Sequence, residues 1–356
     1  MRAIVLKAKS QSDKIRSLSP VTMQDIADTL GITKVSVSKA INNQPGVGDE
    51  LREKILQTSA RMGYKPIRRT ISAKARRFAF VCPKRFFLED DSFYTTIFYY
   101  VNKRSIQNGE SLHSFIVNDR DEVSLKLPVP LTARRFDGIY IAGQFQESFL
   151  DRLFQLSGCK IAIDFYRPQL ETDSVITENY RLGQLVTERL IQSGHRNIGF
   201  VGDPSTTSSI GDRYSGYRRM LEQHNLPFDK SWVLCNNDAL TGAYHLNCNL
   251  PAQLPTAFVC HCDKAAFMLK QQLEQAGRRV PQDVSLISFD NTRLATLLNP
   301  GLTSVDFDRR MIADAAVQLL HRRLNTPDMP PQVVYIKGEL QERGSVGSVG
   351  PAREVS

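Results

Sequence analysis

The chain has 356 residues, of which 41% are hydrophobic and 23% charged, a composition typical of a globular protein with two or three domains. It has no apolar run as long as a membrane span and no secretory signal at its start, which favours a cytoplasmic protein. Residues 1–77 contain 16 Lys/Arg against 6 Asp/Glu, whereas the remaining 30 basic and 31 acidic residues nearly cancel. Charge placed in this way indicates a polyanionic partner.

Residues 1–20 form a basic segment that has no sustained hydrophobic period and ends in Pro20. We expect a basic N-terminal arm that is able to contact phosphate groups. An inert tail is an equal alternative, because nothing in the pattern separates the two.

Residues 21–65 carry the apolar spacing of three short helices. Thr22 is a suitable N-cap for the first, and Gly31 allows a sharp turn before Thr33, which can cap the second. Asp49 begins the third helix. Three helices around a small core, with the second presenting a polar face outward, are the arrangement of a helix-turn-helix DNA-binding domain. An ordinary helical bundle with a solvated face shows the same period.

This stretch contains, in order, Val21-Thr22, Asp25-Ile26-Ala27, Gly31-Ile32-Thr33, Val37-Ser38-Lys39, Asn42, Val47, Leu51-Arg52, Ile55 and Gly63-Tyr64-Lys65-Pro66. The ordered set resembles the DNA-binding headpiece of the lactose-repressor (LacI/GalR) family of bacterial transcription regulators. The resemblance implies a major-groove reader of operator DNA. The residues that it implies in DNA binding are Thr22, Thr33, Lys34, Val35, Ser36, Ser38, Lys39, Asn42, Tyr64, Arg68, Arg69 and Ala73.

Residues 66–77 lie where the family has a hinge that folds on operator DNA and inserts a leucine into the minor groove. Ala73 stands at the leucine position, with Ile71 as an alternative insertion residue, and the segment looks a few residues shorter. We therefore expect weaker or different coupling between effector and DNA. Operator affinity should depend less on kinking and more on phosphate contacts from Arg68, Arg69, Arg76 and Arg77.

From Phe78 onward, short apolar runs alternate with amphipathic helices, which predicts two doubly wound α/β subdomains. The predicted strands are Phe78–Cys82, Ser114–Val117, Gly138–Ala142, Lys160–Asp164, Ser174–Thr177, Asn197–Val201, Ala257–Cys260 and Val284–Phe289. The predicted helices are Arg181–Ser193, Ser215–His224, Lys264–Ala276 and Arg309–Arg323. We expect a core over 78–342, divided into about 78–166 plus 291–325 and 167–290 plus 326–342, and a flexible tail over 343–356.

The family resemblance continues through this core, in Arg135–Ile139, Gly194–Phe200, Arg213–Arg218 and Val280–Ser285. It implies a fold like that of periplasmic sugar-binding proteins, with a small polar effector held in a cleft between the subdomains. The residues implied to bind this effector are Phe93, Asp164, Arg213, Asp263 and Asp290. Cys262 stands where the family usually has Asn, so the ligand pose departs from the usual one.

Enzyme motifs are absent from the sequence: it has no GxxxxGK[ST], GxGxxG or GxSxG. Cys260-His261-Cys262 could offer metal ligands, but no second pair has a plausible spacing. We therefore expect no catalytic residues, no metal and no cofactor.

Together these features predict a cytoplasmic, nucleoid-associated transcriptional repressor of bacteria, whose affinity for double-stranded operator DNA depends on a sugar-like effector. One headpiece buries little surface, so we expect a homodimer on two half-sites. The tail after Leu340 lacks leucine heptads, which argues against a tetramer. A small-molecule-binding protein with a vestigial headpiece, or an enzyme, are the alternatives. Salt-dependent retention on DNA excludes the former and turnover of sugars establishes the latter.

Overall fold

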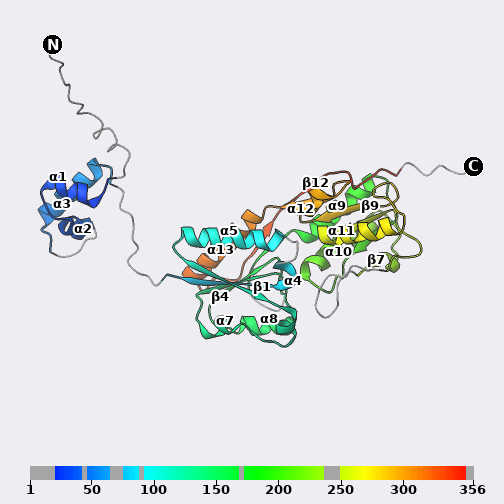
Figure 1. Cartoon of the computed structure of the whole chain (residues 1–356), viewed down its shortest axis with the longest axis horizontal. Coiled ribbons are helices and arrows are strands. Elements are labelled where there is room, and N and C mark those ends of the chain that lie inside the picture. Colours follow the sequence, from blue (N-terminus) through cyan, green and yellow to red (C-terminus); the bar gives the residue numbers. More distant parts are fainter. Residues whose placement is uncertain are drawn as a thin grey trace, which may run out of the picture. The chain divides into compact units, whose positions relative to one another are not determined.

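The computed structural model describes residues 21–41, 46–64, 75–87, 92–167, 172–235 and 249–349. The chain divides into two compact units, Met1–Ala73 and Lys74–Ser356 (Figure 1). None of the helices in the described ranges is long and apolar enough to cross a membrane.

The first unit contains helices α1 (Met23–Leu30), α2 (Lys34–Ile41) and α3 (Asp49–Arg61). Thr22 and Asp25 form a capping box at the start of α1: the Asp25 N–H bonds Thr22 Oγ1, and the Thr22 N–H bonds the Asp25 carboxylate. Gly31 ends α1 with a φ of 65°, which only glycine adopts readily. Five fully or nearly fully buried side chains form the core: Ile26, Ala27, Val37, Ala40 and Ile55.

The second unit contains two six-stranded sheets. The first has the order β11-β5-β4-β3-β1-β2, and all its pairings are parallel. Its strands are β1 (Arg77–Pro83), β2 (Ser111–Val117), β3 (Gly138–Ala142), β4 (Cys159–Ile163), β5 (Asp173–Thr177) and β11 (Val333–Ile336). Helices α5 (Ser92–Gln107) and α13 (Arg309–Asn325) cover one face, and α7 (Val129–Ala133) and α8 (Glu147–Phe154) the other (Figure 1). The short α4 (Lys84–Phe87) and α6 (Asp119–Val123) follow β1 and β2.

The second sheet has the order β12-β10-β9-β8-β6-β7, and β12 pairs antiparallel to β10. Its strands are β6 (Ile198–Val201), β7 (Val233–Leu234), β8 (Ala257–Cys260), β9 (Ser285–Phe289), β10 (Thr303–Phe307) and β12 (Gly338–Gln341). Helices α9 (Asn179–Gln192) and α10 (Ser208–Gln223) cover one face. Helices α11 (Asp263–Gln275) and α12 (Arg293–Leu297) cover the other, and a short 3-10 helix, Lys230–Trp232, precedes β7.

The central strands are buried on both faces, which explains their continuous apolar sequences. In β8, Ala257 and Val259 pack in the cluster that contains α9 and α10, whereas Phe258 and Cys260 pack in the cluster that contains α11. This alternation is the two-residue period of a strand with helices on each side. The predicted fold class, a helical headpiece with two doubly wound α/β subdomains, is confirmed.

The expected division of the core, 78–166 plus 291–325 and 167–290 plus 326–342, is wrong at three strands. Strands β5 and β11 belong to the first sheet, and β10 belongs to the second together with β12. The chain therefore crosses between the subdomains three times, after β5, β10 and β11. The sequence Thr-Ser-Val-Asp-Phe of β10 is too polar to indicate a buried strand, and without it the crossover was misplaced.

The expected flexible tail over 343–356 is also corrected, because residues 343–349 pack on the second subdomain. Ser345 is buried, and its hydroxyl donates to the Leu286 carbonyl at 2.7 Å. The carbonyl of Gly347 lies 3.1 Å from Nε2 of buried His195, and the N–H of Val349 donates to the Ser193 carbonyl. Residues 350–356 lie outside the described residues.

Candidate functional site

Helix α2 presents the predicted reading surface. Val37 and Ala40 face the core, which turns Lys34 and Val35 outward. Val35 is 62% exposed, an unusual position for a β-branched apolar side chain. The Thr33 hydroxyl accepts the N–H of Ser36 at 3.2 Å, so it caps the helix as the sequence predicted. The first turn of α2 is thus ordered and open to a partner.

The other predicted DNA-binding residues differ in their exposure and in the contacts that they already make. Thr22 is exposed, but its hydroxyl already takes part in the capping box. Ser36, Ser38 and Lys39 are half-buried on α2. Tyr64 packs against the headpiece core and its N–H bonds the Ser59 carbonyl at 2.9 Å. The predictions for Asn42, Arg68, Arg69 and Ala73 lie outside the described residues, as does the arm over 1–20.

The folded headpiece itself carries no net charge. Residues 21–64 contain five Lys/Arg and five Asp/Glu. The excess positive charge lies on either side, with a net +4 in residues 1–20 and +6 in residues 65–77. The bundle therefore supplies shape and a few donors, and its flanks supply the long-range attraction to a polyanion.

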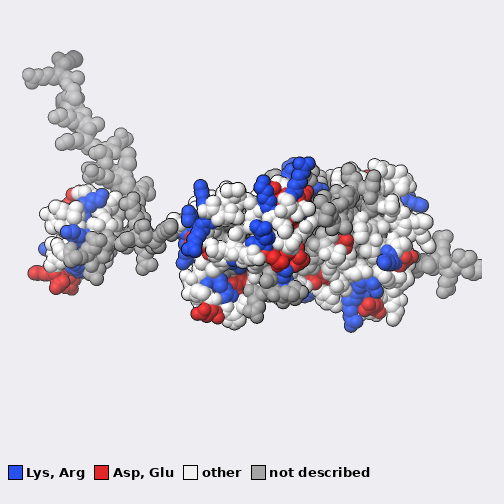
Figure 2. All heavy atoms as spheres, turned by 90° about the horizontal axis from the view of Figure 1, so that it is seen from below, with Lys and Arg blue, Asp and Glu red and all other residues white. Residues whose placement is uncertain are grey.

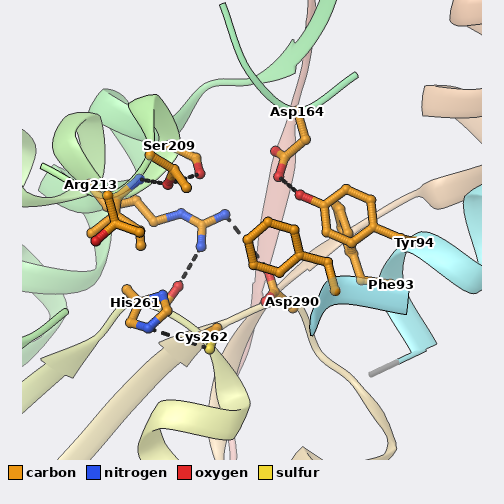
Figure 3. A pocket seen from close by; sticks show the side chains of 12 residues that line it. Phe93, Tyr94, Asp164, Ser209, Arg213, His261, Cys262 and Asp290 are labelled. Atoms are coloured by element: carbon orange, nitrogen blue, oxygen red, sulfur yellow. Dashed lines mark hydrogen bonds and ion pairs between the residues drawn. The ribbon is translucent and has the colours of Figure 1, made fainter. Parts of the chain in front are cut away.

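A cavity lies between the two core subdomains, beyond the carboxyl ends of β4, β8 and β9 (Figure 3). This is the place where open parallel sheets bind ligands. The first subdomain contributes aromatic side chains from helices α4 and α5 and one carboxylate. The second contributes a guanidinium, hydroxyl groups and a second carboxylate. The lining residues are Phe86, Phe93, Tyr94, Asp164, Thr206, Thr207, Ser209, Ile210, Arg213, His261, Cys262 and Asp290.

Arg213 is held in place by the close approach of α9 and α10. A Cβ on Gly216 would come within 2.1 Å of the Tyr180 carbonyl oxygen, so only glycine permits this packing one turn from Arg213. The Arg213 guanidinium donates to Asn179 Oδ1 at 2.9 Å and to the His261 carbonyl, and lies 3.6 Å from Asp290. It also stacks over the Phe289 ring, 4.4 Å from the centroid.

Asp164 is the cavity's incompletely bonded carboxylate. Its Oδ2 accepts the Tyr94 hydroxyl at 2.6 Å, whereas its Oδ1 is buried with no hydrogen-bond partner. Burial raises the pKa of Asp164, and the nearby Arg213 and the Tyr94 hydrogen bond oppose that rise. Burial and the same carboxylate raise the pKa of Tyr94, which stays a hydrogen-bond donor. Figure 3 shows the two side chains facing each other across one wall of the cavity.

Asp290 directly follows strand β9 of the second sheet, as Asp164 directly follows strand β4 of the first. The N–H of Asp164 bonds Val175 of the next strand and the N–H of Asp290 bonds Val305, each at 2.8 Å. Both residues have positive φ, 65° and 95°, which costs energy for a residue other than glycine. Strained backbone at both strand ends turns the two carboxylates toward the cavity.

Aromatic rings form the apolar side of the cavity. Phe86 and Tyr94 are stacked with centroids 5.6 Å apart, and Phe93 meets Tyr94 edge to face at 5.0 Å. Phe93 is 3% exposed, so its ring is available only to a ligand inside the cavity. Flat apolar faces beside carboxylates suit a ligand with both apolar C–H surface and hydrogen-bond donors.

Asp263, which was predicted to bind effector, is not among the residues that line the cavity. Its buried carboxylate accepts hydrogen bonds from the hydroxyls of Ser288, Thr292 and Ser304 and from the Thr292 N–H. Burial raises its pKa despite these bonds. The residue therefore joins the start of α11 to β9 and β10, and its function is structural.

Seven lining residues were not predicted from the sequence: Phe86, Tyr94, Thr206, Thr207, Ser209, Ile210 and His261. Thr207 and Ser209 were missed because α10 begins at Ser208, about two turns before the predicted Ser215. Burial and Arg213 lower the pKa of His261 to about 3, so its ring is neutral at physiological pH. Cys262 lies in the cavity and also caps α11, where its Sγ accepts the Ala265 N–H at 3.4 Å.

The cleft is narrow in this structure, with an internal volume of about 50 Å³. Small-molecule sites usually measure roughly 300–1,000 Å³. Hydrogen bonds join the two walls: Ser208 N–H to Gln144 Oε1 at 2.7 Å, Tyr166 N–H to Ser208 Oγ at 3.3 Å, and Tyr166 hydroxyl to Asp212 at 3.0 Å. A sugar-sized ligand therefore requires the walls to separate.

Comparison with known families and sequences agrees with this geometry. A family profile described as bacterial regulatory proteins, lacI family, matches residues 22–66, and one described as a periplasmic binding protein-like domain matches residues 187–346. The HTH-type transcriptional repressor PurR of Pasteurella multocida is 27% identical over 92% of this chain and 99% of its own. The PurR repressor of Haemophilus influenzae strain PittEE is 27% identical over the same shares.

Solved structures share the fold. A lac repressor dimer bound to operator and the anti-inducer ONPF has a TM-score of 0.63 at 19% identity, covering 93% of this chain and 100% of its own. A complex of the regulator CelR with cellobiose has a TM-score of 0.64 at 21% identity, covering 91% and 99%. A LacI family regulator from Enterococcus faecium with bound ribose has a TM-score of 0.64 at 22% identity, covering 77% and 100%.

Proposed function

This chain belongs to the lacI family of bacterial regulatory proteins, and on that premise we propose that it is a transcriptional repressor whose affinity for operator DNA is set by a small polar effector in the core cleft. The observation that carries the proposal is the pairing of two sites in one chain. Helix α2 exposes an ordered polar turn with Val35 at its surface, and the cleft buries a carboxylate oxygen of Asp164 that lacks a partner. The first suits a DNA reader and the second a ligand sensor.

Lys34, Val35 and Lys39 select bases. Lysine side chains donate to guanine N7 and O6, and a valine contacts the thymine methyl group in the major groove. Ser36 and Ser38 on the same helix, and Thr22, Thr33, Asn42 and Tyr64 around it, position the helix on the sugar–phosphate backbone. The protein acts as a homodimer on two half-sites, as in the operator-bound lac repressor dimer, because one headpiece buries too little surface for genome-wide specificity.

The effector is an uncharged molecule with several hydrogen-bond donors, and a sugar or sugar derivative meets this description. Asp164 Oδ1 needs a donor, whereas Arg213 already has partners in Asn179, His261 and Asp290. An anionic ligand such as a sugar phosphate would face two carboxylates against one engaged guanidinium, which is unfavourable. The neighbours solved with cellobiose and ribose support a sugar.

Residues 66–77, which join the headpiece to the core, are the subject of a separate prediction. Because Ala73 replaces the expected leucine, Arg68 and Arg69 hold the DNA mainly through phosphates. The substitution Ala73→Leu should therefore increase both operator affinity and operator bending. Strong bending by the unmodified protein together with a neutral Ala73→Leu would contradict this.

Selection from a random duplex library tests the function. The full-length protein should enrich a near-palindromic sequence, and Lys34→Ala and Val35→Ala should each relax one base position at a cost of about 1–3 kcal/mol. Ser36→Ala on the same turn is the contrasting variant, because loss of a backbone contact should weaken binding to all sequences equally and relax no base position. A sugar library screened by thermal shift, followed by operator release, then identifies the effector. Absence of any enriched sequence contradicts the repressor function and favours a small-molecule-binding protein.

The protein works at the nucleoid in the cytoplasm, and it is not an enzyme.

A further inference from the structure

One edge of the first core sheet carries a concentration of arginine. All six strands of this sheet run in the same direction, so their amino ends lie together, and the carboxyl end of α13 returns to the same edge. The basic rim at this edge is formed by Arg76, Arg77, Arg134, Arg135 and Arg322, which are exposed or half-buried. Figure 2 shows a band of Lys and Arg atoms at one end of the core.

Hydrogen bonds fix the rim. The Arg77 N–H bonds Asp137 Oδ2 at 2.7 Å, and the Arg77 guanidinium donates to the Arg135 carbonyl at 3.0 Å. The Arg76 guanidinium donates to Asn325 Oδ1 at 3.3 Å. The loop before β3, the start of β1 and the end of α13 are therefore held together, so the arginines form one ordered surface.

The rim is not neutralised by carboxylates. Among the described residues, none of its five arginines forms an ion pair. Of the nearby carboxylates, Asp137 lies in the rim and accepts the Arg77 N–H. Asp173 pairs with Arg323 at 2.7 Å, and Glu110 Oε1 lies 2.8 Å from His321 Nε2. This is notable because residues 78–356 together carry a net charge of −1. The local excess of positive charge thus lies within a nearly neutral core.

We propose that the basic rim is a second DNA-binding surface, which holds backbone phosphates flanking the bases that the headpiece reads; this rests on the proposed repressor function. Arg76 and Arg77 are the first basic residues after the link over 65–74, which adds Lys65, Arg68, Arg69 and Lys74. The rim therefore begins two residues after the link that joins the core to the headpiece. Guanidinium groups bind phosphate oxygens in bidentate fashion. Because the folded headpiece is electrically neutral, the arm over 1–20, the link and the rim supply the salt-dependent part of affinity.

The double variant Arg134→Ala/Arg135→Ala in the full-length protein tests the proposal. Both side chains are exposed and lack ion pairs, so the fold should persist, which thermal unfolding checks. Affinity for the selected duplex is measured between 50 and 200 mM KCl. Each phosphate contact contributes about 0.9 to the slope of log K against log salt, so the slope should fall by about 2 per protomer. Over this range that is roughly a tenfold smaller loss of affinity per protomer, or roughly a hundredfold for the homodimer.

The matched control is Arg278→Ala/Arg293→Ala, which removes the same charge from exposed positions of the second subdomain. Trimming the duplex to the bases that the headpiece reads should abolish the effect of the rim variant. An unchanged slope, or an equal fall in the control, overturns the proposal. If the rim variant still enriches the same operator while its slope stays unchanged, only the rim proposal fails and the repressor function stands.

Discussion

The two walls of the cleft place equivalent carboxylates in different surroundings. Asp164 and Asp290 each follow a central strand, each have positive φ, and each donate an N–H to the next strand of their sheet. Asp290 pairs with Arg213, whose guanidinium is bonded by the same subdomain. Asp164 has Tyr94 on one oxygen and nothing on the other. The carboxylate of the second wall is therefore paired within its own subdomain. One carboxylate oxygen of the first wall still needs a hydrogen-bond donor, which a ligand can supply.

This difference indicates how ligand and DNA are coupled. The first subdomain carries Asp164 at the carboxyl edge of its sheet and the basic rim at the amino edge. Because a ligand must separate the hydrogen-bonded walls to reach Asp164, we expect its binding to move the first wall, and with it the whole parallel sheet, relative to the second wall. Two ligands that bias the same rigid body are coupled in free energy, typically by 1–3 kcal/mol. Four substitutions test the contrast between the walls.

The largest expected effect is a loss of stability from Asp263→Ala in the second subdomain, which forms the second wall. This change leaves buried donors of Ser288, Thr292 and Ser304 without an acceptor. Because each unsatisfied donor costs about 1–3 kcal/mol, the free energy of unfolding should fall by about 3–5 kcal/mol. Urea denaturation measures it, with the exposed Asp328→Ala as control. A loss below 1 kcal/mol would show that this wall is not held by Asp263.

The second effect is expected for Arg213→Ala. It removes the cation between Asn179, the His261 carbonyl and Asp290, so the second wall loses its order and the effector loses an oriented surface. Effector affinity, measured by calorimetry, should fall by about 2–4 kcal/mol. Arg218→Ala is the control on the same helix, since Arg218 pairs with Glu222 and does not line the cavity. Unchanged affinity for every effector places the ligand elsewhere.

Local sequence patterns predicted the headpiece well because its structure depends on near neighbours. The capping box of Thr22 spans three residues, and the turn depends on Gly31 alone. The cleft was predicted in part: Phe93, Asp164, Arg213 and Asp290 do meet at one cavity. These positions came from family resemblance, which places strand ends but does not show which side chains satisfy one another.

Asp263 and the subdomain boundaries show where sequence reasoning stops. The hydrogen-bond partners of Asp263, Ser288 and Ser304, lie 25 and 41 residues away in the sequence. No local pattern therefore reveals that the Asp263 carboxylate already accepts these hydrogen bonds. Strand β10 supplies Ser304 and was missed because its polar residues are buried through tertiary partners, Ser304 by Asp263 and Thr303 by the Arg343 carbonyl. Burial of a polar residue depends on tertiary partners, and hydrophobic periodicity cannot indicate it.

A third prediction concerns Asp164→Asn, which should stabilise the free protein at neutral pH and weaken effector binding. Burial raises the pKa of Asp164 in the folded state, so the stability that it contributes is fully present below its unfolded pKa and is lost as pH rises through the folded pKa. Asparagine keeps an acceptor for Tyr94 and cannot ionise. The gain at neutral pH should be on the order of 1 kcal/mol, the usual cost of an incompletely bonded buried polar group.

Thermal unfolding of both proteins from pH 4 to pH 8 measures this effect. The difference in stability should be smallest in acid and grow as the pH rises. Asp328→Asn serves as control, because it makes the same substitution at an exposed position. A variant that is less stable than the unmodified protein at neutral pH would mean that the first wall is already complete without ligand.

The smallest effect is expected for Gln144→Ala, which removes a bond between the walls and leaves both carboxylates in place. Gln144 Oε1 accepts the N–H of Ser208 at the first turn of α10, where helical N–H groups have no partner within the helix. Losing this bond should destabilise the closed cleft by about 0.5–1.5 kcal/mol, and so raise the fraction of open molecules about 2- to 10-fold. Since a cavity of about 50 Å³ admits no sugar, the effector binds through the open form, and its association rate should rise by the same factor. Stopped-flow binding measures that rate, with the exposed Gln155→Ala as control. An unchanged rate would show that the Gln144 bond does not limit access and that the first wall opens about other contacts.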